Sequence, residues 1–170
     1  MVIMANFHSG VKLIAVCDKS GHTIEVSKNI LALCGCDSYR VAPADEPVGQ
    51  DVQPMVLLFR DAEKIKDAKL FSACVADYEL AVRPELDGLH LLTYSITSNN
   101  ADFTARNIRQ TQDGFAAFEI VGVGVIGRVK LAAGCDQSVE TALAAAAAAI
   151  ACGIPFAEVL EALNHIKIEI

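Results

Sequence analysis

The residue types that point most directly to chemistry lie in one short polar loop, Asp18-Lys19-Ser20-Gly21-His22-Thr23. The loop follows the apolar run Val11–Val16, which is typical of a strand covered on both faces, and precedes a stretch up to Leu33 with helical apolar spacing. A buried strand, a loop of small residues and a helix that opens with threonine form the layout of a phosphate-binding loop. The pattern therefore predicts that Asp18, Lys19, Ser20, Gly21, His22 and Thr23 are the cofactor-binding residues.

Two positions of this loop argue against tight nucleotide binding. His22 stands where a phosphate-binding loop carries its lysine, and an imidazole is mostly neutral at pH 7. Asp18 stands at an early glycine position, where its carboxylate would repel a bound triphosphate by roughly 1–4 kcal/mol. Gly21 and Thr23 are retained. We expect at most weak binding of ATP with Mg²⁺ and predict a vestigial loop with neither a catalytic residue nor a metal site.

A second glycine pattern, Gly122-Val-Gly124-Val-Ile-Gly127, matches the letters of a dinucleotide-binding motif. That motif needs a helix after it, whereas Arg128–Leu131 has the composition of a strand. We interpret the segment as a glycine-rich hairpin turn.

The six cysteines are predicted to be reduced thiols. Cys34 and Cys36 are too close together for the usual two-residue zinc knuckle, and Cys17, Cys74, Cys135 and Cys152 each stand alone. Nothing at the N-terminus has the pattern of a secretion signal, so we expect a cytoplasmic protein.

The elements that must position the loop alternate between buried strands and helices in the first half of the chain. Met55–Phe59 and Cys74–Asp77 are predicted strands, Asp61–Phe71 a helix, and Ala42–Pro54 a surface loop. Alternating strands follow, at Leu89–Ile96, Asp102–Arg109, Ala116–Val121 and Val125–Leu131. The order predicts one mixed α/β domain over residues 1–170, with parallel α/β units followed by a meander.

The last part of the chain is predicted to be helical. An Ala-rich helix is expected at about Val139–Cys152, with Gly153 as its stop and Pro155 near the start of another helix. The Ala-rich run is short and flanked by Glu140, so we interpret it as a buried helix rather than a membrane span.

Composition excludes several classes of protein. Hydrophobic residues make up 53% and charged residues 21% of the chain, which excludes intrinsic disorder. The net charge of −7, with scattered lysines and arginines, argues against a nucleic-acid partner. We expect neither a nucleic acid nor a membrane as partner, and expect a homo-oligomer or a protein partner instead.

The chain resembles the central, ATP-binding domain of the Mur ligases, the amide ligases of peptidoglycan assembly. Val11–Ile24 resembles their strand and phosphate loop, written TGTNGKTT in the family. Asn100–Ile108 with Gly114–Phe118 resembles their meander, and Thr141–Ala145 with Gly153–Leu163 resembles their final helices. The resemblance implies a three-layer, P-loop-like α/β fold with a mostly parallel sheet plus an antiparallel meander.

Several departures from the family's pattern coincide with its phosphate, metal and adenine contacts. After the second strand this chain has Arg60-Asp61 in place of the family's Asn and Asp-His residues, and Gln137, Ser138 and Thr141 stand where its asparagines are expected. The family's magnesium-binding Glu and its metal-assisting Lys have no equivalent in register, and its N-terminal and C-terminal domains are absent from the sequence.

Three functions are compatible with the sequence. The first is a degenerate, non-catalytic Mur-ligase-like domain that acts as a binding or regulatory module, linked to peptidoglycan synthesis only through the family. The second is an ATP-dependent amide ligase subunit that works with separate partner domains and uses Lys19 or Lys28 in place of the missing loop lysine. The third is a purely structural role. Likeness of fold alone does not decide among them.

Overall fold

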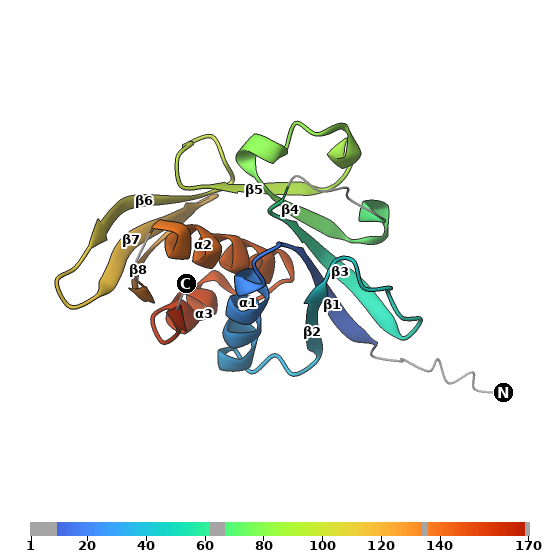
Figure 1. The fold of residues 1–170 in the computed structure, drawn as a ribbon, viewed down its shortest axis with the longest axis horizontal. Coiled ribbons are helices and arrows are strands. Elements are labelled where there is room, and N and C mark those ends of the chain that lie inside the picture. Colours follow the sequence, from blue (N-terminus) through green and yellow to red (C-terminus); the bar gives the residue numbers. More distant parts are fainter. Residues whose placement is uncertain (1–9, 62–66, 134–135, 169–170) are drawn as a thin grey trace.

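The structure is a computed structural model that describes residues 10–61, 67–133 and 136–168. These residues build one sheet of nine strands in the order β2-β1-β3-β4-β5-β6-β7-β8-β9 (Figure 1). The strands from β2 to β6 run parallel, β6 to β8 run antiparallel, and β9 lies parallel to β8. The fold is therefore a mixed α/β domain with a mostly parallel sheet and an antiparallel arm.

The parallel half is covered on both faces, as its nearly continuous apolar strands predict. Ile14 and Val16 point to one face and pack into the main core, whereas Leu13 and Ala15 point to the other. The strands of this half are β1 (Val11–Cys17), β2 (Tyr39–Pro43), β3 (Val52–Phe59), β4 (Ala73–Asp77) and β5 (Leu91–Ser95).

The antiparallel arm alternates between buried and exposed residues, as expected when only one face of a sheet is covered. On its central strand Phe118 and Ile120 are buried, while Ala117 and Glu119 lie on the other face. The strands of the arm are β6 (Phe103–Gln110), β7 (Phe115–Gly122) and β8 (Val125–Ala133), and β9 (Lys167–Ile168) completes the sheet.

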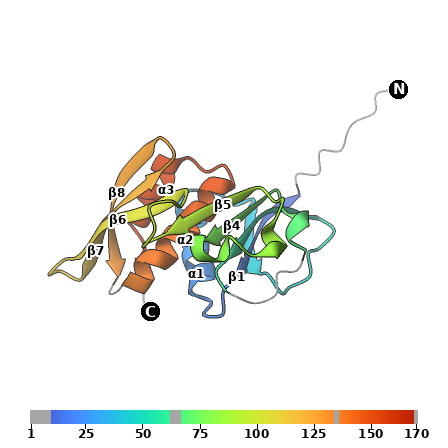
Figure 2. The same ribbon diagram turned by 90° about the horizontal axis from the view of Figure 1, so that it is seen from above.

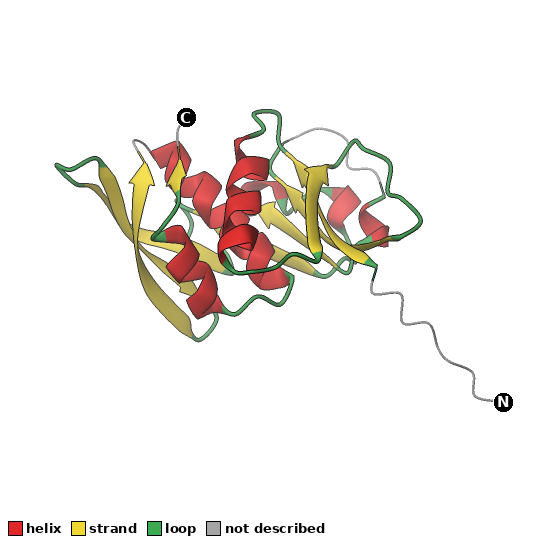
Figure 3. Ribbon diagram, turned by 90° about the horizontal axis from the view of Figure 1, so that it is seen from below, coloured by secondary structure: helices red, strands yellow, loops and turns green. Residues whose placement is uncertain are grey.

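The described residues form three α-helices, which lie together on one face of the sheet (Figures 1 and 3). They are α1 (His22–Leu33), α2 (Asp136–Ala151) and α3 (Phe156–Leu163). α2 runs between α1 and α3 and contacts β3 to β6 (Figure 2). Its run of alanines from Ala144 to Ala149 is almost completely buried, because small side chains let neighbouring elements approach closely. No helix in the described ranges is both long and apolar enough to cross a membrane.

The opposite face of the parallel half is covered without any α-helix among the described residues. Short 3₁₀ turns, η1 (Ala68–Leu70), η2 (Tyr78–Leu80) and η3 (Pro84–Leu86), connect the strands there. Ala68 and Phe71 pack on Leu13 and Leu57, and Leu86 packs on Phe59. Over the described residues, the outer layer on this face therefore consists of turns and loops.

Most predicted elements are confirmed, and three differ. Tyr39–Pro43, for which no strand was predicted, is the edge strand β2, and only the stretch between Pro43 and Val52 of the expected loop is irregular. The strand expected at Leu89–Ile96 pairs parallel with both neighbours and so belongs to the parallel half, not the meander. Of the expected helix Asp61–Phe71, residues 62–66 lie outside the described part, and the remainder contains only the 3₁₀ turn η1.

Candidate functional site

The polar loop lies at the carboxyl edge of the parallel strands, between β1 and α1. Gly21 takes a left-handed backbone conformation, φ 74°, immediately before the first residue of α1, and residues with a Cβ rarely adopt this φ. At the same edge the backbone N–H of Arg60, the residue after β3, donates to the carbonyl of Cys17 at 3.0 Å. The carboxyl ends of parallel strands are where open α/β sheets bind ligands.

The carboxylate of Asp18 occupies the loop's own donors. It accepts from the backbone N–H of Ser20 at 3.0 Å and from that of Thr23 at 3.3 Å, and the hydroxyl of Thr23 also donates to it. The hydroxyl of Ser20 donates to the same carboxylate at 2.9 Å. N–H groups that a phosphate-binding loop offers to an anion are therefore satisfied here by a side chain of the loop.

The pKa of Asp18 lies below its usual range. Burial alone would raise this pKa, but the hydrogen bonds from Thr23 and Ser20 and the charge of Arg60 outweigh it. The carboxylate is thus ionised at neutral pH and held in the loop.

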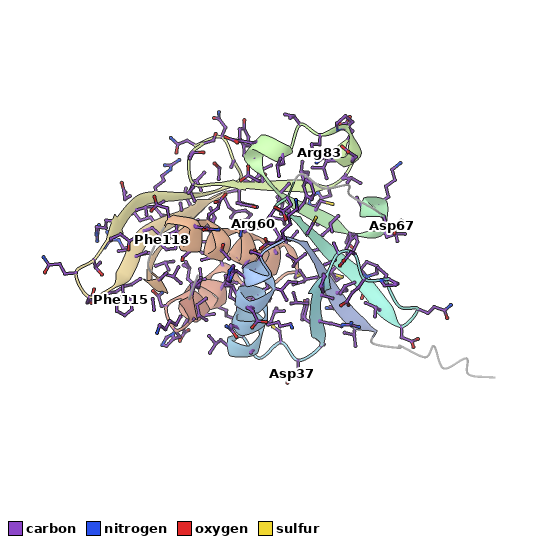
Figure 4. The ribbon with its side chains drawn as sticks, viewed as in Figure 1. Asp37, Arg60, Asp67, Arg83, Phe115 and Phe118 are labelled. Atoms are coloured by element: carbon purple, nitrogen blue, oxygen red, sulfur yellow. The ribbon has the colours of Figure 1, made fainter. Side chains whose placement is uncertain are left out.

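Arg60 brings a positive charge to the loop, and its side chain is only 12% exposed. Its Nη1 donates to the hydroxyl of Thr23 at 2.9 Å and to that of Thr141, on α2, at 2.8 Å. The same nitrogen lies 3.9 Å from Asp18 Oδ2. Figure 4 shows Arg60 where the ends of β3, α1 and α2 come together. Through these hydrogen bonds Arg60 connects the end of β3 to α1 and α2 beside the loop.

A second set of polar side chains surrounds the guanidinium. Nη2 of Arg60 lies 3.7 Å from Glu140 Oε2, and the phenol of the fully buried Tyr94 interacts with Arg60 as well. Burial raises the pKa of Glu140; Arg60 opposes this shift, and a hydrogen bond with Asp77 adds to it. The raised pKa indicates a carboxyl pair in which Glu140 holds its proton more firmly than an ordinary glutamate.

The other predicted loop residues lie nearer the surface. Lys19 and Ser20 are exposed, and His22 is half-buried at the first position of α1. The backbone N–H of Lys19 donates to the carboxylate of Asp61. Lys28 lies on the outer side of α1, where it lines a hollow along β2, so the structure does not bring it to the loop.

Sequence reasoning did not assign a role to Arg60, Thr141, Glu140, Asp77 or Tyr94. A signal existed for Arg60, because a charged residue directly after a buried parallel strand must lie at the sheet edge where ligands bind. Thr141 was recognised only as a lost asparagine, and nothing in the sequence pairs it with Arg60, 81 positions away.

No group of three or more His, Cys, Asp or Glu side chains that could hold a metal ion occurs within the parts of the chain that the structure describes. The arrangement holds one guanidinium among hydroxyls and carboxyl groups, and the backbone N–H groups of Ser20 and Thr23 donate to an internal carboxylate. The Gly122–Gly127 segment is confirmed as a glycine-rich hairpin and takes no part in this edge. Val123 and Gly124 form the turn between β7 and β8, and Gly127 lies within β8.

The fold is similar to that of solved Mur ligases. One is the UDP-N-acetylmuramoylalanyl-D-glutamyl-2,6-diaminopimelate–D-alanyl-D-alanyl ligase from Acinetobacter baumannii, with a TM-score of 0.71 and 16% identity over 96% of this chain and 47% of that one. Another is the UDP-N-acetylmuramate–alanine ligase from Thermotoga maritima, with a TM-score of 0.68 and 13% identity over 92% of this chain and 45% of that one. A third is a type C pseudomurein peptide ligase from Methanothermus fervidus, with a TM-score of 0.60 and 18% identity over 93% of this chain and 49% of that one.

The chain has the Mur-ligase-like fold and spans about half the length of these solved chains. No protein-family model matches its sequence, and no curated protein matches it. At these identities the likeness establishes the fold alone.

Proposed function

We propose that this chain is a degenerate counterpart of the Mur ligase central domain that acts as a non-catalytic binding or regulatory module in the cytoplasm. Under this proposal its phosphate loop is retained as a structural element, and its link to cell-wall peptide synthesis is that of a regulator or partner of such enzymes. A homo-oligomer or a complex with another protein is the expected working form.

One observation carries the proposal: the loop is filled from within. The Asp18 carboxylate takes the backbone donors at the start of α1, and Arg60 takes the hydroxyl of Thr23, the residue type that holds Mg²⁺ in a working loop. A nucleotide phosphate would have to displace Asp18 and break its hydrogen bonds, each worth roughly 1.5–3 kcal/mol for a charged acceptor. Formation of an acyl phosphate needs a clamped γ-phosphate and a well-held divalent cation, and this loop offers neither.

The test is calorimetric titration of MgATP and MgADP into the native protein and three variants, Asp18→Gly, His22→Lys and the double variant. We expect no heat of binding at millimolar nucleotide for the native protein. We expect none for His22→Lys either, because Asp18 still fills the loop. The double variant should bind MgADP, since it frees the donors and supplies the missing lysine.

A matched control is Asp37→Gly, which removes an exposed carboxylate from the turn after α1 and should leave nucleotide binding unchanged. If the double variant folds, as shown by an unchanged circular dichroism spectrum, and still binds no nucleotide, Asp18 is not what excludes the ligand. Micromolar binding by the native protein would contradict the proposal directly.

One observation favours the alternative, an ATP-dependent amide ligase subunit working with separate partner domains. Arg60 places a permanent positive charge beside the loop, in which His22 stands at the position of the family's lysine. If the Asp18 carboxylate swung out, Arg60 would face the incoming phosphate. The same titrations, with Arg60→Ala added, distinguish this alternative from the proposal. The alternative requires that the native chain bind MgATP and that Arg60→Ala lose this binding.

A further inference from the structure

The outward face of the antiparallel arm, away from the helices, carries ordered rows of side chains. Cross-strand pairing sets Arg106, Glu119 and Arg128 in one row, because Glu119 on the central strand β7 pairs with both arginines. The next row contains Arg109, Ala117 and Lys130, since Ala117 pairs with the other two. The described residues thus place four cations on this face, in a chain of net charge −7.

The small side chain of Ala117 leaves a hollow between two long cationic ones. An open cavity of about 750 Å³ lies here, and its lining includes Asn107, Arg109, Ala117, Arg128 and Lys130. Neighbouring strands are about 4.8 Å apart, so the backbones that carry Arg109 and Lys130 are separated by roughly 10 Å. The hollow is therefore a trough along β7 with a cation on each wall.

The cations of the trough are only partly neutralised. Lys130 Nζ lies 3.0 Å from Asp113 Oδ2, and Arg128 Nε lies 3.8 Å from Glu119 Oε1 while its side chain stays 91% exposed. Arg109 forms no ion pair with any residue in the described ranges. Two carboxylates face four cations, so the face keeps an excess of positive charge.

An apolar end continues the same face. Ile126, paired with Val121, is 65% exposed, and Val123 at the tip of the β7–β8 turn is 84% exposed. Such β-branched side chains in water mark an interaction surface when they lie together beside charged groups. The trough thus ends at two exposed apolar side chains of the β7–β8 hairpin.

We propose that this trough binds an extended acidic segment of a partner polypeptide, with an apolar side chain of the segment seated on Ile126 and Val123. Alternate residues of an extended chain lie about 7 Å apart, which matches the spacing of successive rows along β7. The cations are spread over two walls and two rows rather than gathered at one point, which suits carboxylates repeated along a chain better than a single phosphate group.

This site is independent of the polar loop. Phe115 and Phe118, which lie on β7, are well separated from Arg60 in Figure 4. The proposal therefore holds whether or not the loop binds a nucleotide.

Fluorescence anisotropy of a labelled peptide tests the proposal. The probe is an acetylated peptide in which glutamate alternates with threonine and one leucine precedes the repeat; its control carries glutamine in place of glutamate. We expect the full protein to bind the glutamate peptide more tightly than the glutamine peptide and to lose affinity as salt is added. Each cation removed by Arg109→Gln or Lys130→Gln should weaken binding about two- to fivefold, as for exposed ion pairs.

Two further variants separate shape and apolar contact from charge. Ala117→Phe fills the trough without changing its charge and should abolish binding, and Ile126→Ser should weaken binding only of the peptide that contains leucine. The matched control, Lys28→Gln with Arg40→Gln, removes two exposed cations near β2 and should leave binding unchanged.

The proposal is overturned if both peptides bind equally or if Arg109→Gln and Lys130→Gln leave binding unchanged. Displacement of the peptide by an equal concentration of inorganic phosphate would overturn it in favour of a small-anion site. Tighter binding of an oligothymidylate than of the peptide would overturn it in favour of nucleic acid.

Discussion

Arg60 donates to the hydroxyl of Thr23 at 2.9 Å, so the hydroxyl that a phosphate-binding loop offers to Mg²⁺ is held by an internal cation. The same guanidinium reaches α2 through Thr141. The loop at the end of β1, the end of β3 and the start of α2 are therefore joined by one buried side chain.

Removing this cation is expected to cost stability. Arg60→Ala leaves the largely buried Asp18 carboxylate without its counter-charge and should lower the free energy of unfolding by about 3 kcal/mol. Urea unfolding followed by circular dichroism measures the change. Arg40→Ala is the control, because the Arg40–Glu46 pair is about half exposed and is worth at most about 1 kcal/mol. Equal losses in the two variants would mean that Arg60 adds nothing beyond a surface ion pair.

The hydrogen bond from Arg60 to Thr141 can be weighed separately. Thr141 is 2% exposed, so Thr141→Val keeps its volume and removes the acceptor of a charged donor. We expect a loss of roughly 1.5–3 kcal/mol, the usual range for hydrogen bonds to charged groups. Thr141→Ser retains the hydroxyl and should lose clearly less, mainly through the missing methyl group. If Thr141→Ser is the more damaging variant, packing rather than the hydrogen bond is what Thr141 contributes.

The raised pKa of Glu140 leads us to expect that the stability of the protein depends on pH. Its pKa is raised in the folded protein, by burial first and also by Asp77, so the folded state binds this proton more tightly than the unfolded state. The contribution of Glu140 to the free energy of unfolding is therefore fully present below the pKa of this group in the unfolded chain, near 4.3–4.5. It is lost as the pH rises through the higher pKa of the folded protein. Glu140→Gln should remove that decline, which urea titrations across mildly acidic to neutral pH would show.

Asp18 has the opposite effect on the pH dependence of stability, so it is a comparison for the Glu140 experiment. Its folded pKa is lowered, so its contribution is present above the unfolded pKa and disappears as the pH falls through the folded one. Asp18→Asn should flatten the acid limb of the stability curve while leaving the Glu140 decline in place. A Glu140→Gln protein with an unchanged profile above pH 4.5 would contradict the carboxyl pair.

The sequence predicted the elements well where one physical pattern dominates. The apolar runs at Val11–Val16 and Met55–Phe59 and the alanine run of α2 predict burial. Leu13–Val16, Val56–Phe59 and Ala144–Ala149 are buried, whereas Val11 at the start of β1 is exposed. β2 was missed because Tyr39–Pro43 is a short edge strand that ends in a proline and is followed by Asp45, Glu46 and Pro47, a composition typical of a loop. β5 was grouped with the meander because parallel and antiparallel pairing leave the same apolar spacing in a single strand.

Of the candidate site, the sequence pointed only to the residues of one loop. Loop residues Asp18 to Thr23 are neighbours in sequence, so their types and order indicated an anion-binding layout with a misplaced carboxylate. What Asp18 does, accept the loop's own donors, depends on backbone geometry that no residue type specifies. Arg60 and Thr141 come together only through the packing of α2 on the sheet, so their contact had no signature in spacing.

Gly127, the last glycine of the pattern that resembles a dinucleotide motif, is needed for packing between β8 and α3. A Cβ on Gly127 would lie 2.0 Å from Cδ1 of Leu160 on α3, so the glycine lets this leucine rest directly on β8. Gly127→Ala should force Leu160 out of place and lower the thermal unfolding midpoint, at a cost of about 1–3 kcal/mol for overpacking. Removing the obstacle in Gly127→Ala/Leu160→Ala should cost less than the sum of the two single changes, since the two sites share one contact. Strict additivity in this double-mutant cycle would show that Gly127 is not where α3 and the arm meet.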